Sequence, residues 1–407
     1  MSSISTQSRS WMSSLRILAA VTAIAVSVIY LPQPLLSNLV TSFSTTTTAA
    51  SSIATAVQLG YAVGIFFLVP LADRIQPRRQ ITFQLVLLAG ALAATALLPT
   101  VASVALGFLA VGLVANIAQL IIPVAMRLAP TDRKHHTTGT LVSSLLIGIF
   151  GGRIIASLLI GWLGWRGTVL IFAAMVLATV PFVRAVLPKY IEASTSHSYL
   201  RLLGSTLKRV GTSPALRESS IMQFFGFALF NSIWTVMVLL LTGTHYGWTV
   251  AEAGLFGIVG LAAGFVTPFA GSWIQRFGAT RITGAFLGLL ILATASIVID
   301  SNLIWMFGVS MFLLTWASQV LQSANQSRSL LSNPNGPAQA NTIFMVSVFL
   351  GGSLGAILGP IAFQTGGMSA VALQGLVFAA AFAITWAVSI WRQKRPAAEM
   401  GTVLGLG

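Results

Sequence analysis

The chain contains no cysteine among its 407 residues. Disulfide bonds, thiol nucleophiles, cysteine-ligated zinc and iron–sulfur clusters are therefore excluded, and cysteine usage gives no information on the redox compartment. Only four histidines are present: His135 and His136 are neighbours, whereas His197 and His245 lie far apart in sequence. No pattern typical of a zinc protease, a serine hydrolase or a phosphate-binding loop occurs. We expect no metal, no cofactor and no enzymatic activity.

Charged residues are also scarce, at 7% of the chain compared with about 25% in a typical soluble protein. Hydrophobic residues make up 56%, so the composition places the chain in a lipid bilayer. The seven acidic residues all fall in expected loops, tails or helix ends: Asp73, Asp132, Glu192, Glu218, Glu252, Asp300 and Glu399. We therefore expect no carboxylate deep in the membrane of the kind that proton-coupled carriers commonly use.

Apolar runs long enough to cross a hydrocarbon core of about 30 Å as helices occur repeatedly along the chain. We predict twelve such helices, at residues 15–40, 50–71, 80–98, 103–126, 138–161, 167–187, 218–242, 251–273, 282–299, 303–324, 339–362 and 370–391. The first run exceeds the apolar region of a signal peptide and lacks a persuasive cleavage site, so we interpret it as an uncleaved helix. The predicted fold class is an all-α integral membrane protein.

The distribution of Lys and Arg predicts the orientation. With the amino terminus in the cytoplasm, twenty of the 22 basic residues fall in tails, inner loops and their flanks, which leaves Arg166 outside and Arg153 within a helix. The positive-inside rule then places both termini in the cytoplasm. The net charge of +15 is spread over many loops, so it forms no surface for nucleic acid.

Two stretches of the chain repeat one pattern. Residues 71–79 and 273–281 each follow one apolar run and precede another, and they begin 202 positions apart. A membrane protein built from two like halves can rock one half against the other around a central site. The repeat therefore indicates transport before any substrate is considered.

The longest inner connection divides the chain into a first half at residues 1–187, a linker at 188–217 and a second half at 218–407. Within the linker, apolar residues recur at helical spacing: Leu200, Leu203, Leu207 and Val210. This spacing predicts an amphipathic helix on the inner leaflet. A solvated linker whose charges only fix the topology explains the sequence equally well.

The first copy of the repeat resembles the loop after helix 2 in the major facilitator superfamily, where the pattern is approximately Gly-x-Leu-Ala-Asp-Arg-x-Gly-Arg-Arg. The matching residues are Leu71, Ala72, Asp73, Arg74, Arg78 and Arg79, the last two after one additional residue. Val69 and Pro77 stand where the family has glycine. The second copy preserves Gly271, Arg276, Phe277, Gly278 and Arg281 but carries Gln275 at the aspartate position.

The resemblance covers essentially the whole chain and implies twelve helices in two pseudo-symmetric bundles of six. It also implies that the repeated loop is a cytoplasmic gate, in which Asp73 accepts hydrogen bonds from helix amides or an arginine. The candidate gating residues are Asp73, Arg74, Arg78, Arg79, Gln275, Arg276 and Arg281. The alternative is that the basic residues merely fix the topology.

Glycine pairs in two predicted helices add to the resemblance, because drug-efflux members of the family carry a Gly/Pro-rich motif in helix 5. The candidate packing residues are Gly148, Gly151, Gly152, Gly351 and Gly352, and the two pairs lie 200 positions apart. Such glycines permit close helix contact and would seal the joint between the halves. Ordinary small-residue packing is the alternative.

Arg153 is the one charged side chain placed well inside a predicted span. An arginine at that depth costs about 2.5 to 3.5 kcal/mol, so it should face the bundle interior and find a partner. It either hydrogen-bonds neighbouring helices and locks the bundle, or it receives an anionic or strongly accepting substrate.

In the family, helices 1, 4, 7 and 10 line the central cavity, and each contributes polar or aromatic groups here. The candidate substrate-binding residues are Tyr30, Gln33, Asn116, Gln119, Asn231, Trp234, Trp316 and Gln319, together with Arg153. Amides fix orientation and indoles give broad apolar contact, which suits an amphipathic solute. Hydrogen bonding between helices is the alternative role for each.

The resemblance implies a monomeric carrier of the bacterial inner membrane, most like the drug and metabolite efflux branch, in contact with lipids. We expect export of a small amphipathic or anionic organic solute by alternating access, with proton antiport implied by the family. Uptake of a sugar or other solute, by a facilitator or a proton symporter, is the nearest alternative. A non-transporting receptor and a lipid flippase are alternatives of another class.

Overall fold

The computed structural model describes the backbone of residues 2–189, 199–300 and 302–403. Within these ranges every regular element is a helix, which confirms the all-α prediction. Nine of the described helices are long and apolar enough to cross a membrane, and the bent pair Val250–Val266 and Ala270–Phe277 makes a tenth. The chain is a multi-pass membrane protein.

Several helices of the first half begin at residues whose backbone chemistry favours a helix start. Its elements are α1 (Ser2–Ser27), η1 (Val28–Tyr30), α2 (Pro32–Phe43), α3 (Thr47–Leu68), η2 (Pro70–Asp73), α4 (Pro77–Ala96), α5 (Val101–Val114), α6 (Ile117–Leu128), η3 (Thr131–Arg133), α7 (Lys134–Leu146), η4 (Ile147–Gly151) and α8 (Gly152–Val186). Proline opens α2 and α4, where the first backbone N–H has no helical partner to lose.

The second half follows a linker helix. Its elements, with the linker helix first, are α9 (Tyr199–Thr212), α10 (Pro214–Thr242), α11 (Val250–Leu255), α12 (Gly257–Val266), η5 (Thr267–Phe269), α13 (Ala270–Phe277), α14 (Ala279–Asp300), α15 (Ile304–Leu331) and α16 (Pro337–Val403). Thr249 caps α11, because its hydroxyl accepts the Glu252 amide while the Glu252 carboxylate accepts the Thr249 amide.

Two long helices break at glycines that have left-handed backbone angles. Gly164 in α8 has φ 63°, and Gly367 in α16 also has φ 63°, a conformation that glycine adopts without steric penalty. The apolar helices that contain them are 51 and 57 residues long, more than twice the roughly 20 residues that a membrane crossing needs. Both breaks fall where the sequence predicts a short loop between two spans.

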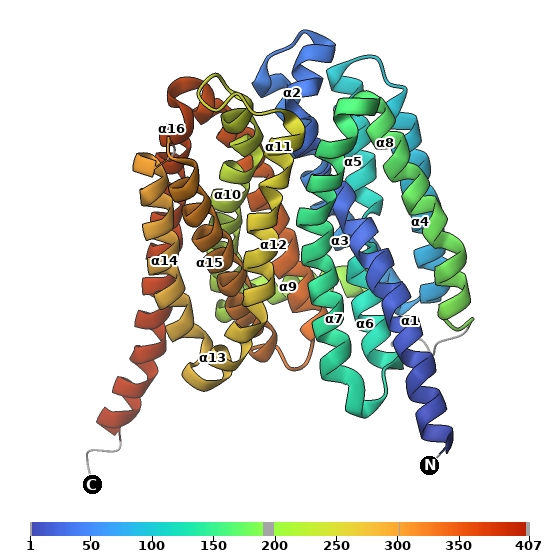
Figure 1. Ribbon diagram of the computed structural model, residues 1–407. Coiled ribbons are helices and arrows are strands. Elements are labelled where there is room, and N and C mark those ends of the chain that lie inside the picture. The colour runs from blue at the N-terminus through green and yellow to red at the C-terminus, as the bar shows by residue number, and fades with distance from the viewer. Residues whose placement is uncertain (1, 190–198, 301, 404–407) are drawn as a thin grey trace.

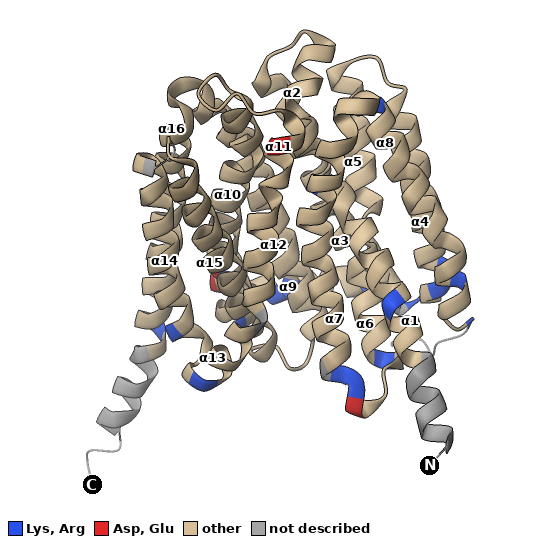
Figure 2. Ribbon diagram, viewed as in Figure 1, with Lys and Arg blue, Asp and Glu red and all other residues tan. Residues whose placement is uncertain are grey.

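The helices form two groups. Figure 1 shows those up to α8 gathered on one side of the molecule and those from α10 on the other. The groups meet where α3 packs against α16, α8 against α11, and α2 against α10. The start of α1 and the end of α16 lie at the same end of the molecule, which we call the terminal end, and Figure 2 shows most Lys and Arg residues there.

The linker helix α9 connects both groups at the terminal end. The Tyr199 hydroxyl donates to Phe67 O, at the end of α3, at 2.7 Å. At its other end, Arg209 donates to Asn335 O, between α15 and α16, at 2.7 Å. The predicted helix therefore exists, and it is tied to one group at its start and to the other at its end.

The two faces of α9 differ from the sequence prediction in one respect. Leu203 is buried together with Leu202 and Thr206, whereas Leu200 and Leu207 are exposed. The buried face of α9 packs on α10 and α16. Part of the predicted apolar face is therefore used in contacts within the protein. The exposed leucines are the ones that remain available to a membrane surface.

Glycines of α11 and α12 make the closest contact between the groups. A Cβ atom added at Gly254 would lie 2.0 Å from Ser157 Cβ, and one added at Gly260 would lie 2.2 Å from the Phe150 ring. Real Cβ atoms do not approach neighbours this closely. At these two positions the backbone of the second half therefore packs directly against side chains of α8 and η4.

The predicted packing glycines lie in several different contacts. Gly148 and Gly152 face α1 within the first half, where added Cβ atoms would lie 2.3 Å from Ala23 O and 2.4 Å from Ser27 Cβ. Gly151 has only the Ile147 side chain nearby, at 3.8 Å. Gly148 and Gly152 bring η4 and the start of α8 onto α1 and do not form the joint between the halves.

The second glycine pair divides its contacts between the halves. A Cβ added at Gly351 would lie 2.0 Å from Phe224 O on α10, within the second half. One added at Gly352 would lie 2.1 Å from Gln58 Oε1 on α3, in the first half. Gly352 is therefore the member of the predicted set that lies at the joint.

We predict that Gly254→Ala destabilises the protein. The new methyl group would overlap Ser157, and overpacking of this kind costs about 1 to 3 kcal/mol. Thermal unfolding of the purified protein in detergent, followed by tryptophan fluorescence, measures the change. Gly288→Ala on α14 is the matched control, because nothing lies within 4 Å of a Cβ at that position; equal midpoints for the two variants would contradict the prediction.

Candidate functional site

A break in the first span positions two of the predicted site residues. The helical path changes from α1 to the short turn η1, and Pro32 then opens α2. Proline has no N–H to donate to the preceding turn, so the regular helical hydrogen bonding is interrupted within the apolar span. Tyr30 and Gln33 lie on either side of Pro32, and both are buried.

Arg153 lies on α8, directly after the π-helical turn η4, and is only 4% exposed. Its Nε donates to Gln33 Oε1 at 2.9 Å. Its two terminal nitrogens have no hydrogen-bond partner among the described residues. A buried guanidinium therefore keeps most of its donor capacity unused, which is uncommon for a charged group away from water.

Three aromatic rings surround the Arg153 charge. The guanidinium carbon lies over the Tyr30 ring at 4.7 Å, the Trp234 ring at 4.8 Å and the Phe150 ring at 5.2 Å. Each such contact contributes about 0.5 to 2 kcal/mol, so three are comparable with an insertion cost of about 2.5 to 3.5 kcal/mol. The rings stabilise the charge but accept no ordinary hydrogen bond from its N–H groups.

Gln33 carries the connection from Arg153 to the second half. Its Nε2 donates to Asn231 Oδ1 at 2.9 Å and to Thr235 Oγ1 at 3.2 Å, both on α10. Asn231 in turn donates to Gly352 O at 2.7 Å. We call this chain of four residues the Gln33 relay: Arg153, Gln33, Asn231 and Gly352. It crosses the joint between the halves and is buried throughout.

The space beside Arg153 is small in this structure. A cavity of about 10 Å³ is lined by Gln33, Arg153 and Trp234 together with Ser157 and Gly254. That volume holds about one water molecule. The site is occluded, and an organic ligand would require the halves to separate.

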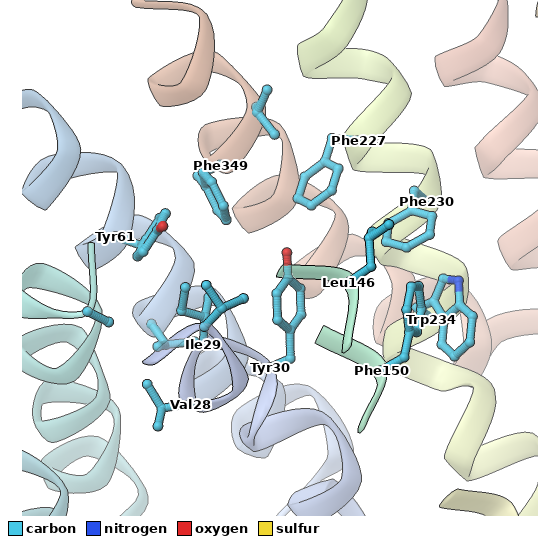
Figure 3. Close-up of a cluster of buried hydrophobic side chains, with 14 of the residues drawn as sticks. Val28, Ile29, Tyr30, Tyr61, Leu146, Phe150, Phe227, Phe230, Trp234 and Phe349 are labelled. Carbon is cyan, nitrogen blue, oxygen red and sulfur yellow. The ribbon is translucent and has the colours of Figure 1, made fainter. Parts of the chain in front are cut away.

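A wider aromatic cluster continues from the site across the joint. Figure 3 shows Tyr30 between the Tyr61–Phe349 pair and the Phe150–Trp234 pair. The ring centroids of these pairs are 4.3 Å and 5.1 Å apart. Each pair joins one ring from the first half to one from the second, so aromatic contacts close the centre of the molecule.

Five predicted substrate-binding residues come together: Tyr30, Gln33, Arg153, Asn231 and Trp234. Sequence reasoning omitted Phe150, although it precedes Arg153 by three positions and therefore shares its helix face. It also omitted Phe227, Phe230 and Phe349, which give no signal that separates them from other apolar helix residues. Packing between helices brings these rings together.

The remaining predicted site residues lie elsewhere. Asn116 is at the break between α5 and α6, where its Nδ2 donates to Leu113 O at 2.8 Å. Trp316 packs with Trp273 and Phe286 on α13 and α14. Neither contacts Arg153 among the interactions of the described residues.

Two predicted glutamines are also separate from the Arg153 site. Gln319 follows Trp316 on α15 and is partly buried. Gln119 lines a cavity of about 160 Å³ with Ala72 and Pro77 of the repeated loop. Its side chain is also hydrogen-bonded to that of Tyr61, so Gln119 lies between the predicted gate and the central aromatic cluster.

The predicted gating residues lie on the terminal end. The backbone of Asp73 ends η2, but its side chain lies outside the described residues. Arg74 and Arg79 are exposed and Arg78 is partly buried; in the second copy Gln275, Arg276 and Arg281 are exposed. Arg276 lies over the Phe277 ring at 5.2 Å.

A buried carboxylate on the second half was not assigned a role from sequence. Glu218, near the start of α10, pairs with Arg328 at the end of α15. It also lies 3.6 Å from Arg392 on α16. This ion cluster ties the terminal ends of three helices together.

Comparison with known proteins identifies relatives along the whole chain. The family model described as Major Facilitator Superfamily matches residues 18–298 and 219–402. The putative uncharacterized transporter YgaY of Escherichia coli is 31% identical over 378 residues, which cover 93% of this chain and 96% of that protein. The probable transporter SCO4007 of Streptomyces coelicolor is 32% identical over 375 residues, which cover 89% and 85%.

Solved transporter structures share the fold. The nucleoside transporter NupG superposes with a TM-score of 0.75 at 15% identity, over 93% of this chain and 98% of that one. The human organic anion transporter MFSD10 (TETRAN) superposes with a TM-score of 0.71 at 14% identity, over 92% and 98%. At these identities the likeness concerns the fold alone.

We predict that Gln33→Met lowers the stability of the protein by about 1 to 3 kcal/mol or more. The substitution leaves Arg153 Nε and Asn231 Oδ1 without their partner, and an unsatisfied buried polar group costs about that much. Thermal unfolding in detergent gives the measurement.

The matched control for Gln33→Met is Gln374→Met on α16. Both the Oε1 and the Nε2 of Gln374 are buried and have no partner among the described residues. Its replacement should therefore change stability little. An equal loss in both variants would show that side-chain volume, and not the Gln33 relay, determines the effect.

Proposed function

Because the chain belongs to the major facilitator superfamily, we propose that it is a secondary active transporter that exports a small amphipathic or anionic organic solute, a drug or a metabolite, by alternating access. The expectation of a transporter and not an enzyme is confirmed by the family and by the named relatives. The observation that carries the finer proposal is the buried Arg153 with two unpaired terminal nitrogens.

The chemistry of the Arg153 site favours an anion with an apolar body. A guanidinium offers planar donors that match a carboxylate, phosphate or sulfonate, and a charge-assisted bond of this kind is stronger than a neutral one. No described acidic side chain lies within ion-pair distance of Arg153. Tyr30, Phe150 and Trp234 supply ring surfaces for the apolar part of the same ligand.

The transport cycle of this proposal uses two bundles of six spans. It counts the apolar helices His136–Val186 and Pro337–Gln393 as two spans each, since both break at a glycine. With the bent pair, the nine apolar helices then become twelve. The bundles are residues 1–187 and 218–407, and they rock around the Gln33 relay. The closed aromatic cluster corresponds to an occluded state of that cycle.

The gate of the proposal is the repeated loop at the terminal end. Loop residues Ala72 and Pro77 border a cavity with Pro123 of α6, Leu202 of α9 and Thr342 of α16. The loop thus adjoins the first half, the linker and the second half at one place. Separation of the halves at that end would open this cavity toward the site.

The proposed location is the bacterial inner membrane, with both termini in the cytoplasm and the monomer as the working unit. Two observations support it. Most Lys and Arg residues lie at the terminal end (Figure 2), as the positive-inside rule requires of a cytoplasmic face. The relatives YgaY and SCO4007 are bacterial proteins.

We predict that Arg153→Gln reduces transport of organic anions about tenfold to a hundredfold, because hydrogen bonds to a charged group contribute about 1.5 to 3 kcal/mol. Arg153→Lys should retain part of the activity, since it keeps the charge but loses the planar donors. The measurement is uptake of anionic, neutral and cationic solutes into liposomes that contain the purified protein.

Arg166→Gln is the matched control for the Arg153 variants. Arg166 lies over the Trp165 ring at 4.3 Å and donates to Leu98 O, but it is exposed and remote from the Gln33 relay. It should transport anions like the unchanged protein. If Arg153→Gln folds normally and transports anions at the control rate, the site has a structural role at most.

Proton antiport forms part of the proposal, and the resemblance to the efflux branch supports it. We predict that an imposed proton gradient accelerates anion movement in the opposite direction in the same liposomes. Valinomycin-clamped potentials separate the effect of pH from that of voltage. Saturable transport that ignores the pH gradient would instead favour facilitated diffusion.

For the gate, we predict that Asp73→Asn slows turnover more than it weakens binding. The carboxylate is proposed to hold the closed cytoplasmic side, so its loss should alter the exchange between states. Transport rates in liposomes and equilibrium ligand binding in detergent distinguish the two effects. A change in affinity with unchanged maximal rate would count against gating.

A further inference from the structure

We propose that a groove on the first half binds an anionic phospholipid of the inner leaflet. The groove has a volume of about 1100 Å³ and is formed by α4, the end of α8 and the loop that contains η2. It is larger than the roughly 300 to 1,000 Å³ of ordinary small-molecule pockets. The groove is separate from the Arg153 site, and the proposal stands independently of the transported solute.

Basic side chains gather at the end of the groove that lies toward the terminal end. They are Arg78 and Arg79 on α4, Arg184 on α8, and Lys189 just after it. No acidic residue is found among the described residues that line the groove. Four cations on one wall, with no carboxylate among the described residues that line the groove, attract an anionic headgroup, and basic pockets between helices on a cytoplasmic face suit such lipids.

The wall farther into the membrane is apolar and open. Phe83, Val86 and Leu87 are 62%, 46% and 42% exposed, although each is a large hydrophobic side chain. Arg79, Phe83 and Val86 follow one another at helical spacing of four and three positions, so they form one stripe along α4. The stripe runs from a cation at the membrane surface to apolar side chains about 10 Å deeper.

A polar group lies within the apolar wall, because Gln84 follows Phe83 and precedes Val86 on α4. Gln84 is 3% exposed and lines the groove, and its Oε1 has no partner among the described residues. No interaction within the protein holds that oxygen, so the side-chain amide can turn to donate to an ester carbonyl. The cations suit the phosphate of a phospholipid, the amide suits an ester carbonyl, and the apolar wall suits an acyl chain.

A second groove shows that size alone does not define the site. It has a volume of about 830 Å³, lies between α11, α12 and α15, and contains Trp248, Trp305 and Phe312. Its lining has no Lys or Arg, and its one carboxylate, Glu252, is used in the cap of α11. Lipid chains can occupy both grooves, but only the first has charges that select an anionic headgroup.

Native mass spectrometry of the purified full chain tests the proposal. The protein is mixed with dioleoyl phosphatidylglycerol or with dioleoyl phosphatidylcholine, and the retained lipid is counted. We expect preferential retention of phosphatidylglycerol and a loss of about tenfold in the double variant Arg184→Gln/Lys189→Gln, because each cation near an anionic surface contributes severalfold to binding.

The matched control is Arg201→Gln/Lys208→Gln. It removes two exposed cations of α9 that do not line the groove, so it should retain phosphatidylglycerol like the unchanged protein. An equal loss in the control would reduce the effect to general surface charge and overturn the site. Equal retention of both lipids by the unchanged protein would overturn it as well.

Two further measurements test the nature of the occupant. Val86→Trp narrows the apolar wall without changing charge and should weaken retention of phosphatidylglycerol. Millimolar inorganic phosphate should not displace the lipid. Retention that is unaffected by Val86→Trp, or lost to inorganic phosphate, would identify a site for free anions and overturn the lipid proposal.

Discussion

The buried guanidinium of Arg153 is the constraint on which the centre of this protein depends. No described carboxylate neutralises it, so its charge is stabilised by ring faces and by one amide oxygen. Those partners lie on three segments: the turn from η1 to α2, the turn η4, and α10. All three segments must come together for the charge to be tolerated. The two terminal nitrogens of Arg153 remain unpaired among the described residues. A hydrogen-bond acceptor that binds to them at this buried site forms a stronger bond than it would in water.

In the proposed transport cycle, the Gln33 relay couples the closure of the halves to the orientation of Arg153. Gln33 accepts from Arg153 in the first half and donates to Asn231 in the second. When the halves separate, Gln33 must exchange its α10 partners for water or for a ligand. In the proposal, a solute that bonds to the terminal nitrogens of Arg153 lies next to Gln33, whose partners on α10 change when the halves separate. Binding of the solute can therefore shift the equilibrium between the closed and the open state.

Sequence reasoning predicted the spans well because a bilayer imposes both length and composition on them. The predicted helix at 80–98 corresponds to α4 (Pro77–Ala96), and the breaks at Gly164 and Gly367 fall in predicted loops. The candidate site was predicted in part: the charge of Arg153 and the polar side chains of Gln33 and Asn231 were visible in the sequence. Trp316 lies in another cluster, because the rotation of a helix about its axis is set by packing and not by hydropathy.

The two halves contribute unequal chemistry to one centre. At the 200-residue offset of the repeat, Arg153 corresponds to Ser353, whose hydroxyl donates to Phe349 O of its own helix. The second half therefore offers no charge at that position, and supplies an amide, an indole and a backbone carbonyl instead. An anion would stay with the first half when the halves separate, while the contacts of Trp234 and Asn231 would be withdrawn. Release then depends on what replaces those contacts, so the uncharged half, and not the arginine, is expected to set how easily the solute leaves.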